Sequence, residues 1–367
     1  MFAERVDRTR AAMAERGVDV LLVSVGADLP WLCGYEAMPL ERLTLLIVPR
    51  EGDARLLVPF LEAPRVVDRP DVFEMLTWRD GEDPVALASG LIGAAGTAAI
   101  GDQTWAGFLV DLTSAMPGTS FSRASAVTAP LRMVKDAAEV DALRGAAAAV
   151  DRILADVQAG NVALAGRTEA AVAAEIAQRI LDEGHRKVNF TIVASGPNAA
   201  SPHHEAGDRV IRDGEGVLFD IGGTMDGADG VGYCSDITRC VHLGEPPSGF
   251  AELYEVLHEA QAVGVAAATV GTPCEDVDAA TRLVIEDAGY GEYFVHRTGH
   301  GIGVEAHEHP NIVVGNDLPL VAGHAFSIEP GIYVPGTWGA RLEDIVVATD
   351  EGPDPLNHID HGLAVVG

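Results

Sequence analysis

The sequence predicts a two-domain protein of the α/β (α+β) class, with an N-terminal α/β domain over residues 1–127 and a second domain over residues 128–367. The chain of 367 residues is longer than most single domains, and 48% of it is hydrophobic, which is enough to bury a large core. Helical and strand patterns alternate up to about Phe121. The later part changes to the order helix pair, strands, helix pair, strands, which suggests two related halves.

The N-terminal domain begins with an amphipathic helix over residues 3–16, which ends at Gly17. Buried strands are expected over residues 18–23 and 43–48, and a further strand over residues 55–58 follows a turn. No Gly-x-Gly-x-x-Gly follows the first strand, and no Gly-Lys-Ser/Thr follows a glycine run. This domain is therefore not expected to bind a nucleotide.

Residues 127–132 are predicted to connect the domains without a helix, because Pro130 disfavours helix at the residue before it. A long alanine-rich helix begins near Lys135 and is expected to face solvent with Glu139, Asp141, Arg144 and Asp151. Three further helices are expected over residues 168–184, 249–270 and 274–288, and strand-rich blocks over residues 189–193, 217–240 and 325–349.

The chain carries 25 Lys and Arg against 55 Asp and Glu, a formal net charge of −30. So acidic a surface disfavours nucleic acid and anionic membranes as partners. The four cysteines do not form a disulfide framework, and no Cys-x-x-Cys indicates a zinc ribbon. The charged first residues lack the apolar run of a signal peptide, and no uncharged apolar stretch of about 18 residues occurs. These features predict a soluble cytoplasmic protein.

Five segments in the last third of the chain each place one oxygen or nitrogen ligand in a defined backbone setting. The ligands are Asp220, Asp236, His300, Glu329 and Glu343. Four carboxylates and one imidazole, with no thiolate, suit a pair of hard or borderline divalent cations that share carboxylate bridges. Such a bridge keeps the ions close, so that a shared water loses a proton near neutral pH. The set predicts a two-metal hydrolase.

Strand periodicity predicts that these side chains converge, because residues two apart on a strand face the same side. Asp220 and Asp236 flank a turn over residues 222–232, and Glu329 and Glu343 flank another over residues 335–339. Their charges in apolar strands would repel one another unless cations lay among them. The residues expected to share faces are Cys234, Asp236, Thr238 and Cys240, then Ser327 with Glu329, and Arg341 with Glu343.

Each of these residues has a simpler explanation when it is taken alone. An Asp before Gly-Gly is usually a turn residue, and a Glu before Pro is usually solvated. The glycines of residues 299–303 could form a phosphate cradle, but no lysine or capped helix follows them. We expect them instead to let the backbone bend tightly and bring His300 to an ion. Cys234 and Cys240 are expected to pack rather than to bind metal.

The five segments resemble those of the pita-bread metallopeptidases, the family of methionine aminopeptidase, aminopeptidase P and prolidase. The two-domain length and Leu131-Arg132-Met133-Val134-Lys135-Asp136 resemble the Xaa-Pro-cleaving branch, and Trp31-Leu32-Cys33-Gly34-Tyr35 resembles part of its N-terminal domain. The similarity covers nearly the whole chain and is strongest from about residue 130 onward. It implies a creatinase-type N-terminal α/β domain and a C-terminal pita-bread domain, a curved antiparallel sheet flanked by two helix pairs.

The resemblance also implies roles for single residues. Asp220 would bind the first ion, Asp236 and Glu343 would bridge both ions, and His300 and Glu329 would complete the second. Glu329 would also take the proton of the attacking water. The remaining catalytic and substrate-binding positions are His203, His307, His296 and Arg341, with His204 as the alternative to His203 near the substrate.

The expected reaction is hydrolysis of the Xaa-Pro bond in dipeptides or short peptides by a metal-bridging hydroxide, with a proline at the second position of the substrate. The two divalent ions are expected to be Mn²⁺, with Co²⁺, Zn²⁺ or Fe²⁺ as alternatives. By analogy with the family, the protein is expected to be a homodimer. Three alternatives stay open: an aminopeptidase P type that acts on longer peptides, a metal-free creatinase-like hydrolase, and a non-catalytic peptide-binding module. Methionine aminopeptidase would leave the N-terminal domain unexplained.

The chain departs from the family's pattern in one place. Asp220 and Asp236 lie 16 positions apart, which is longer than the family's usual hairpin. The additional residues contain two Asp-Gly pairs, which are typical of an extended turn. Asp226 and Asp229 are therefore alternative ligands, and the longer loop could cover the mouth of the site.

Overall fold

The computed structural model describes all residues from Met1 to Gly367. The chain divides into two compact units, one of residues 1–132 with 229–231 and one of residues 133–228 with 232–367. The predicted α/β (α+β) class is confirmed, because both units combine helices with sheets. No helix of the structure has both the length and the apolar character that are needed to cross a bilayer.

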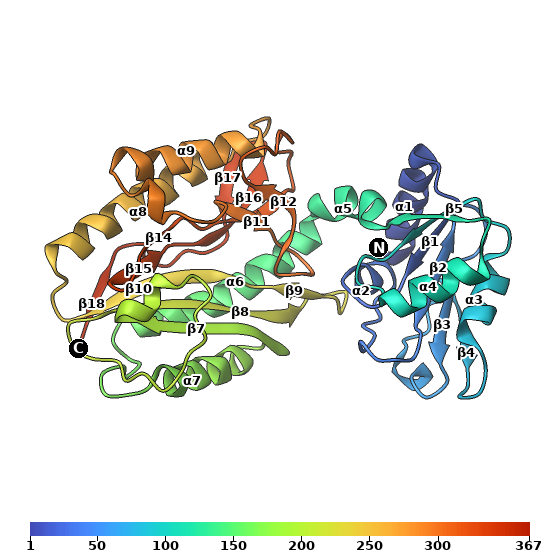
Figure 1. Ribbon diagram of the computed structural model, residues 1–367, viewed down its shortest axis with the longest axis horizontal. Helices are drawn as coiled ribbons and strands as arrows, with labels where there is room; N and C mark the ends of the chain where they lie inside the picture. Colours follow the sequence, from blue (N-terminus) through green and yellow to red (C-terminus); the bar gives the residue numbers. More distant parts are fainter. The chain divides into compact units, whose positions relative to one another are not determined.

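The first unit contains a six-stranded sheet in the order β4-β3-β2-β1-β5-β6 (Figure 1). β2 pairs antiparallel with β1 and β3, and the other neighbours are parallel. Apolar residues of α3 and α4 join the buried core on one face of the sheet. The strands are β1 (Val20–Val23), β2 (Leu45–Pro49), β3 (Arg55–Pro59), β4 (Glu74–Trp78), β5 (Thr97–Ile100) and β6 (Ser120–Arg123). The helices are α1 (Phe2–Arg16), α2 (Asp28–Cys33), η1 (Ala63–Arg65), α3 (Pro84–Ile92), α4 (Ala106–Ala115) and α5 (Ser125–Met133).

Two details of this unit can be compared with the sequence predictions. Gly17 ends α1 in the left-handed conformation at φ 67°, as expected. The prediction of a non-helical connection at residues 127–132 is wrong, because α5 runs through Pro130. The amides of Val127 and Thr128, which precede the proline, bond to the carbonyl of Ala124 and form the first turn of this short helix.

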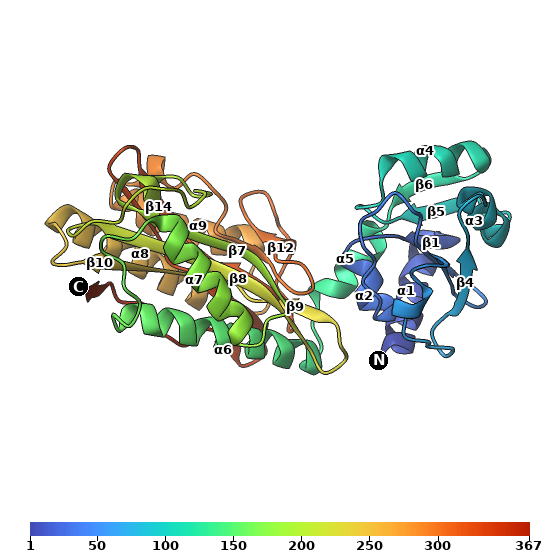
Figure 2. The same ribbon diagram turned by 90° about the horizontal axis from the view of Figure 1, so that it is seen from below.

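The second unit follows the predicted order of helix pair, strands, helix pair, strands. Helices α6 and α7 lie on one side of the strands, and α8 and α9 lie on the other (Figures 1 and 2). The helices are α6 (Ala137–Gln158), α7 (Glu169–Asp182), η2 (Gly196–Ala200), α8 (Ser248–Ala267), α9 (Cys274–Asp287) and η3 (Gly291–Tyr293). The earlier strands are β7 (Lys187–Ser195), β8 (Gly216–Asp226), β9 (Gly232–Cys234) and β10 (Ile237–Leu243). The later strands are β11 (Gly299–Gly301), β12 (Glu308–Ile312), β13 (Ala325–Ile328), β14 (Gly331–Val334), β15 (Trp338–Arg341), β16 (Asp344–Thr349), β17 (Gly352–Pro355) and β18 (Ala364–Val366).

These strands form two five-stranded sheets and a short hairpin. The first sheet has the order β18-β10-β8-β7, with β9 also paired to β8, and the second has the order β12-β11-β13-β16-β17. All pairs are antiparallel except that of β10 with β18. Strands β14 and β15 form the hairpin between Glu329 and Glu343. A bridge from Thr238 to Glu343 connects the first sheet to the end of this hairpin.

Two residues of helix α6 that were expected to face solvent are buried instead. Asp141 is exposed, but Glu139 and Asp151 are buried. Glu139 completes a capping box with Asp136 and accepts a hydrogen bond from Tyr233. Asp151 accepts hydrogen bonds from the C-terminal segment at residues 357–358. Helical periodicity does not reveal partners such as Tyr233 and residues 357–358, because they lie far away in the sequence.

Candidate metal centre

A cavity of about 740 Å³ opens within the second unit and brings the predicted site residues together. All ten side chains singled out in the sequence line it, and five further residues complete the wall. The predicted ones are His203, His204, Asp220, Asp236, His296, His300, His307, Glu329, Arg341 and Glu343, and the others are Phe190, Ile192, Pro202, Glu205 and Arg297.

The strand ladders explain how positions that are distant in sequence converge. Asp220 of β8 lies opposite Thr238 of β10, and Thr238 in turn bridges to Glu343. His300 lies on β11, which pairs with β13, and Glu329 follows β13 directly. The two hairpins therefore direct their carboxylates into one cavity, as expected.

One part of the periodicity argument fails. The strand is interrupted between β9 and β10 at Ser235 and Asp236, so the alternation does not run from Cys234 to Asp236. Cys234 instead contacts Asn189 and Thr224, and neither Cys234 nor Cys240 lines the cavity. Burial raises the pKa of both thiols to about 11. Packing, as expected, is their role in the structure.

The glycines beside His300 serve a different purpose from the predicted bend. Neither Gly299 nor Gly301 has a positive φ. A Cβ atom on Gly299 would overlap the carbonyl oxygen of Ser327, and one on Gly301 would overlap that of His309. The glycines therefore let β11 approach its neighbours closely, with a register shift after His300.

The buried carboxylates are close enough to share cations. Ligand atoms of Asp220, Asp236 and Glu343 lie within 4.8 Å of one another, and the same holds for His300, Glu329 and Glu343. Burial raises the pKa of Asp220, Asp236 and Glu343, and the neighbouring carboxylates raise it further. Burial also acts to raise the pKa of Glu329, but the charge and hydrogen bond of His300 outweigh it and lower that pKa to about 2. In addition, Asp220 Oδ1 is buried without a hydrogen-bond partner.

His300 has the tautomer of a metal ligand. Its Nδ1 lies 3.1 Å from the carbonyl oxygen of Gly301, which can only accept, so Nδ1 carries the hydrogen. Without a cation, a protonated Nε2 can donate to Glu329 Oε1 at 3.1 Å; with a cation in place of that proton, the lone pair of Nε2 would be available as a ligand beside Glu329 and Asp236. Metal-binding histidines usually donate their other N–H to a carbonyl or carboxylate in this way. Together with the crowded carboxylates, this arrangement fits two divalent cations with oxygen and nitrogen ligands.

A buried chain of hydrogen bonds links Asp220 to His296. Arg341 forms an ion pair with Asp220 and donates to the hydroxyl of Tyr333 at 2.7 Å. Tyr333 lies 2.8 Å from His296 Nε2, and His296 Nδ1 lies 2.8 Å from the carbonyl oxygen of Arg297. Both ring nitrogens of His296 are thus occupied, and burial lowers the pKa of its imidazole. Sequence reasoning assigned no role to Tyr333, although it lies only two residues after Glu329-Pro330-Gly331.

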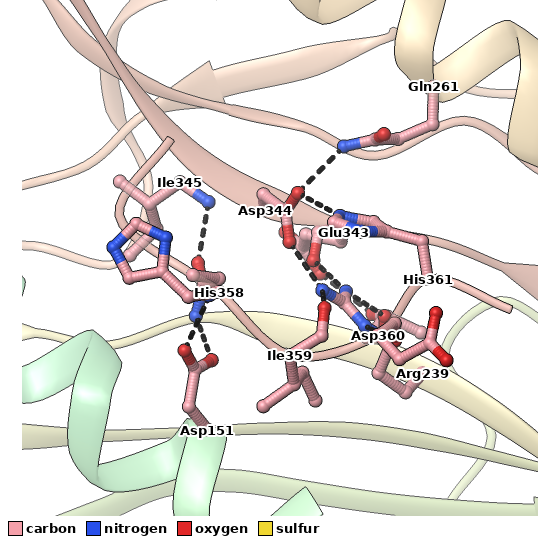
Figure 3. A network of polar contacts seen from close by, with 12 residues as sticks. Asp151, Arg239, Gln261, Glu343, Asp344, Ile345, His358, Ile359, Asp360 and His361 are labelled. Carbon is pink, nitrogen blue, oxygen red and sulfur yellow. Dashed lines mark hydrogen bonds and ion pairs between the residues drawn. The ribbon is translucent and has the colours of Figure 1, made fainter. Parts of the chain in front are cut away.

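A second buried network of hydrogen bonds holds the backbone at Glu343 and the neighbouring Asp344 (Figure 3). Arg239 donates to the carbonyl oxygens of Glu343 at 2.7 Å and Asp360 at 3.1 Å, and it forms an ion pair with Asp344 at 2.7 Å. Asp344 also accepts from Gln261 and His361. Arg239 therefore fixes the backbone that carries Glu343, a role that its place in a Ser-Asp-Ile-Thr-Arg segment did not indicate.

The two adjacent histidines differ in their surroundings. His204 Nε2 lies 2.8 Å from Glu169 Oε2, and Glu169 is fully buried at the start of α7. His203 is exposed and makes no side-chain hydrogen bond. His203 thus has free ring nitrogens at the cavity wall, whereas His204 is anchored. The sequence indicated Glu169 only as a helix start.

The long hairpin does not contribute to the cavity. Asp226 forms an ion pair with Arg186 at 3.1 Å, and Asp229 forms one with Arg5 at 3.2 Å. No residue of 222–232 lines the cavity. Asp226 and Asp229 are thus paired with arginines and are not among the carboxylates that line the cavity.

Comparisons with known proteins agree with this geometry. The chain matches Metallopeptidase family M24 over residues 141–350 and the Creatinase/Prolidase N-terminal domain over residues 5–134. It is 46% identical to "Probable dipeptidase PepE" of Mycobacterium tuberculosis over 370 residues, covering 100% of this chain and 97% of that protein. It is 36% identical to "Xaa-Pro dipeptidase" of Lactobacillus helveticus, with 98% of each chain covered. Among solved structures, the recombinant prolidase of Thermococcus sibiricus matches with a TM-score of 0.92 at 35% identity, covering 100% of this chain and 99% of that one.

Proposed function

Since the chain belongs to metallopeptidase family M24 and is therefore a peptidase, we propose that it hydrolyses the Xaa-Pro bond of dipeptides or short peptides. The observation that carries the proposal is the convergence of all ten predicted side chains on one cavity. The names of its relatives point to the same bond. The creatinase-like and non-catalytic alternatives would be expected to lack ligands, whereas this chain keeps the full set.

Two divalent cations would be held by Asp220, Asp236, His300, Glu329 and Glu343, with Asp236 and Glu343 shared between them. When bound, such ions polarise the scissile carbonyl and lower the pKa of a water molecule towards neutrality. We take Mn²⁺ as the first ion to test, because carboxylate-rich sites suit it.

The remaining groups are proposed to act directly on the substrate and the attacking water. Glu329 accepts the proton of the water, since its carboxylate is ionised at neutral pH. Burial and the nearby charge of His300 lower the pKa of His307 to about 4, so this imidazole is neutral at pH 7. A neutral His307, whose ring centroid lies 4.1 Å from that of His300, can donate a hydrogen bond to the developing oxyanion. His203 is placed at the cavity wall to contact the substrate.

The cavity wall also suits a proline ring. Phe190, Ile192 and Pro202 provide apolar surface beside the charged groups. A peptide bond before proline lacks an N–H, and the ring fixes φ, so general peptidases cleave it poorly. An apolar wall next to the carboxylates offers a place for the ring while the preceding carbonyl faces the centre.

The test is release of the first residue from Xaa-Pro peptides by protein loaded with Mn²⁺. We expect cleavage by the wild type and a loss of roughly 100-fold or more in Glu329→Gln, with an unchanged circular dichroism spectrum. Glu205→Gln is the matched control, because Glu205 lines the cavity outside the proposed ligand set. No cleavage of any Xaa-Pro peptide by fully metal-loaded protein would refute the proposal. The expected homodimer is tested separately by light scattering.

A further inference from the structure

Building on the proposed function, we infer that Glu169 is a positioning residue, which holds the segment of residues 195–204 so that His203 faces the substrate. The carboxylate of Glu169 does not line the cavity, so it acts on the reaction only through this segment. The same contact gives a role to His204, the alternative to His203 in the sequence analysis. One of the two adjacent histidines meets the substrate, and the other anchors the backbone that carries it.

The hydrogen bonds of Glu169 join both ends of this segment to helix α7. Glu169 lies at the start of α7 and is fully buried. Its Oε1 accepts hydrogen bonds from the amide and the hydroxyl of Ser195, each at 2.7 Å, and from Asn198 Nδ2 at 3.1 Å. Its Oε2 accepts from His204 Nε2 at 2.8 Å and from Asn198 Nδ2 at 3.0 Å. An ionised carboxylate has about four lone-pair sites, and these donors use that capacity.

This set of donors matches the ionised form of Glu169, because a protonated carboxyl group would carry a donor of its own. Burial acts to raise the pKa of Glu169, but the hydrogen bonds from Ser195, His204 and Asn198 outweigh it and lower that pKa. Since an ionised carboxylate only accepts, His204 Nε2 carries the hydrogen of the bond between them. A hydrogen bond with one ionised partner is about twice as strong as one between neutral groups, so Glu169 holds the segment firmly.

His203 makes no side-chain hydrogen bond, so its neighbours in the chain keep it at the cavity wall. On one side, the carbonyl oxygen of Pro202 accepts a hydrogen bond from Arg341 at 3.3 Å. On the other side, His204 is bound to Glu169. The backbone on both sides of His203 is thus held, while its imidazole stays available to the substrate. Such preorganisation avoids the cost of ordering the segment when the substrate binds.

The experiment measures kcat/KM for Ala-Pro with variants of the full chain loaded with Mn²⁺. Glu169→Gln keeps the shape of the side chain but replaces one acceptor by a donor. His204→Gln keeps an N–H near the position of Nε2, whereas His204→Leu has no donor. Glu175→Gln is the matched control, because Glu175 lies on the same helix and forms two ion pairs but is 33% exposed. Glu169→Gln is also combined with His203→Ala, and circular dichroism and metal content are measured for every variant.

We expect His203→Ala to lower kcat/KM by roughly 10- to 100-fold, because a contact to the substrate is lost. Glu169→Gln and His204→Leu should lower it by about tenfold, since they misplace the imidazole of His203 without removing it. His204→Gln and Glu175→Gln should stay within about threefold of the wild type. In the His203→Ala background, Glu169→Gln should cause a further loss of no more than about twofold, because the group that it positions is already absent.

The combined variant separates positioning from a purely structural role. If Glu169→Gln lowers kcat/KM by the same factor with and without His203, its effect does not pass through this histidine and the inference is overturned. Wild-type kcat/KM in Glu169→Gln or in His203→Ala would overturn it as well. If Glu169→Gln does not fold, His204→Leu takes its place in the same comparison. The proposed peptidase would stand in all these cases, whereas a wild type that cleaves no Xaa-Pro peptide would refute the proposed function itself.

Discussion

Replacing Arg239 by methionine tests the buried network behind Glu343. The ion pair between Arg239 and Asp344 is almost fully buried, with side-chain exposures of 1% and 2%. Methionine fills a similar volume but removes the charge and the donors to the carbonyl oxygens of Glu343 and Asp360. Asp344 would then remain as a buried charge without its guanidinium partner.

The expected loss follows from that burial. Breaking a buried pair by removing one partner costs about 3–5 kcal/mol. For a folding unit of this size, 1 kcal/mol shifts the melting temperature by about 2–4 °C. Arg239→Met should therefore lower the melting temperature of the metal-free protein by roughly 6–20 °C in scanning calorimetry.

A matched control separates this effect from the loss of any arginine. Arg144 pairs with Asp354 at 2.8 Å, but the two side chains are 41% and 37% exposed. Solvent screens such a pair, so Arg144→Met should cost no more than about 1 kcal/mol. Equal melting temperatures for the two variants would refute the view that the network supports the Glu343 backbone.

Three further perturbations have defined outcomes. Gly301→Ala should lower the melting temperature, because its Cβ would meet the carbonyl oxygen of His309. The control Gly145→Ala, on the exposed side of α6, should raise the free energy of unfolding by about 0.5–1 kcal/mol. An unchanged melting temperature for Gly301→Ala would contradict the close approach of β11 to its neighbours. Tyr333→Phe should reduce kcat/KM by about tenfold without unfolding, because it cuts the hydrogen-bond chain from Arg341; full activity would argue against that chain. In protein whose metal has been removed by a chelator, the free energy of unfolding should fall as the pH rises. The folded-state pKa values of Asp236 and Glu343 lie above the unfolded ones, so their contribution is present at low pH and lost as pH rises through the folded pKa; melting curves that do not change with pH in the chelated protein would contradict this.

The proposed metal ligands could be predicted because each one combines a polar side chain with an apolar strand context. Asp220 lies within the buried strand β8 and Glu343 lies directly before β16, where an unpaired carboxylate is costly. The helices could be predicted equally well, because N-cap residues such as Asp136 and Thr168 precede regularly spaced apolar residues. These signals are local, so a single sequence contains them.

The supporting residues could not be predicted, because their partners are remote. Arg239 meets Glu343 and Asp344 more than 100 positions later, and Glu169 meets His204 35 positions later. Asp151 looked like a solvent-facing helical residue until the C-terminal segment covered it. The sequence around such residues is typical of a solvent-exposed position, and only the tertiary structure shows the buried partner.

The most direct test of the two-cation account is the metal content of the purified protein, measured by elemental mass spectrometry after dialysis against Mn²⁺. About two ions per chain are expected for the wild type, and Asp236→Asn and Glu343→Gln should each retain fewer while staying folded. Wild-type protein that cleaves Xaa-Pro peptides at full rate without bound divalent ions would contradict the account.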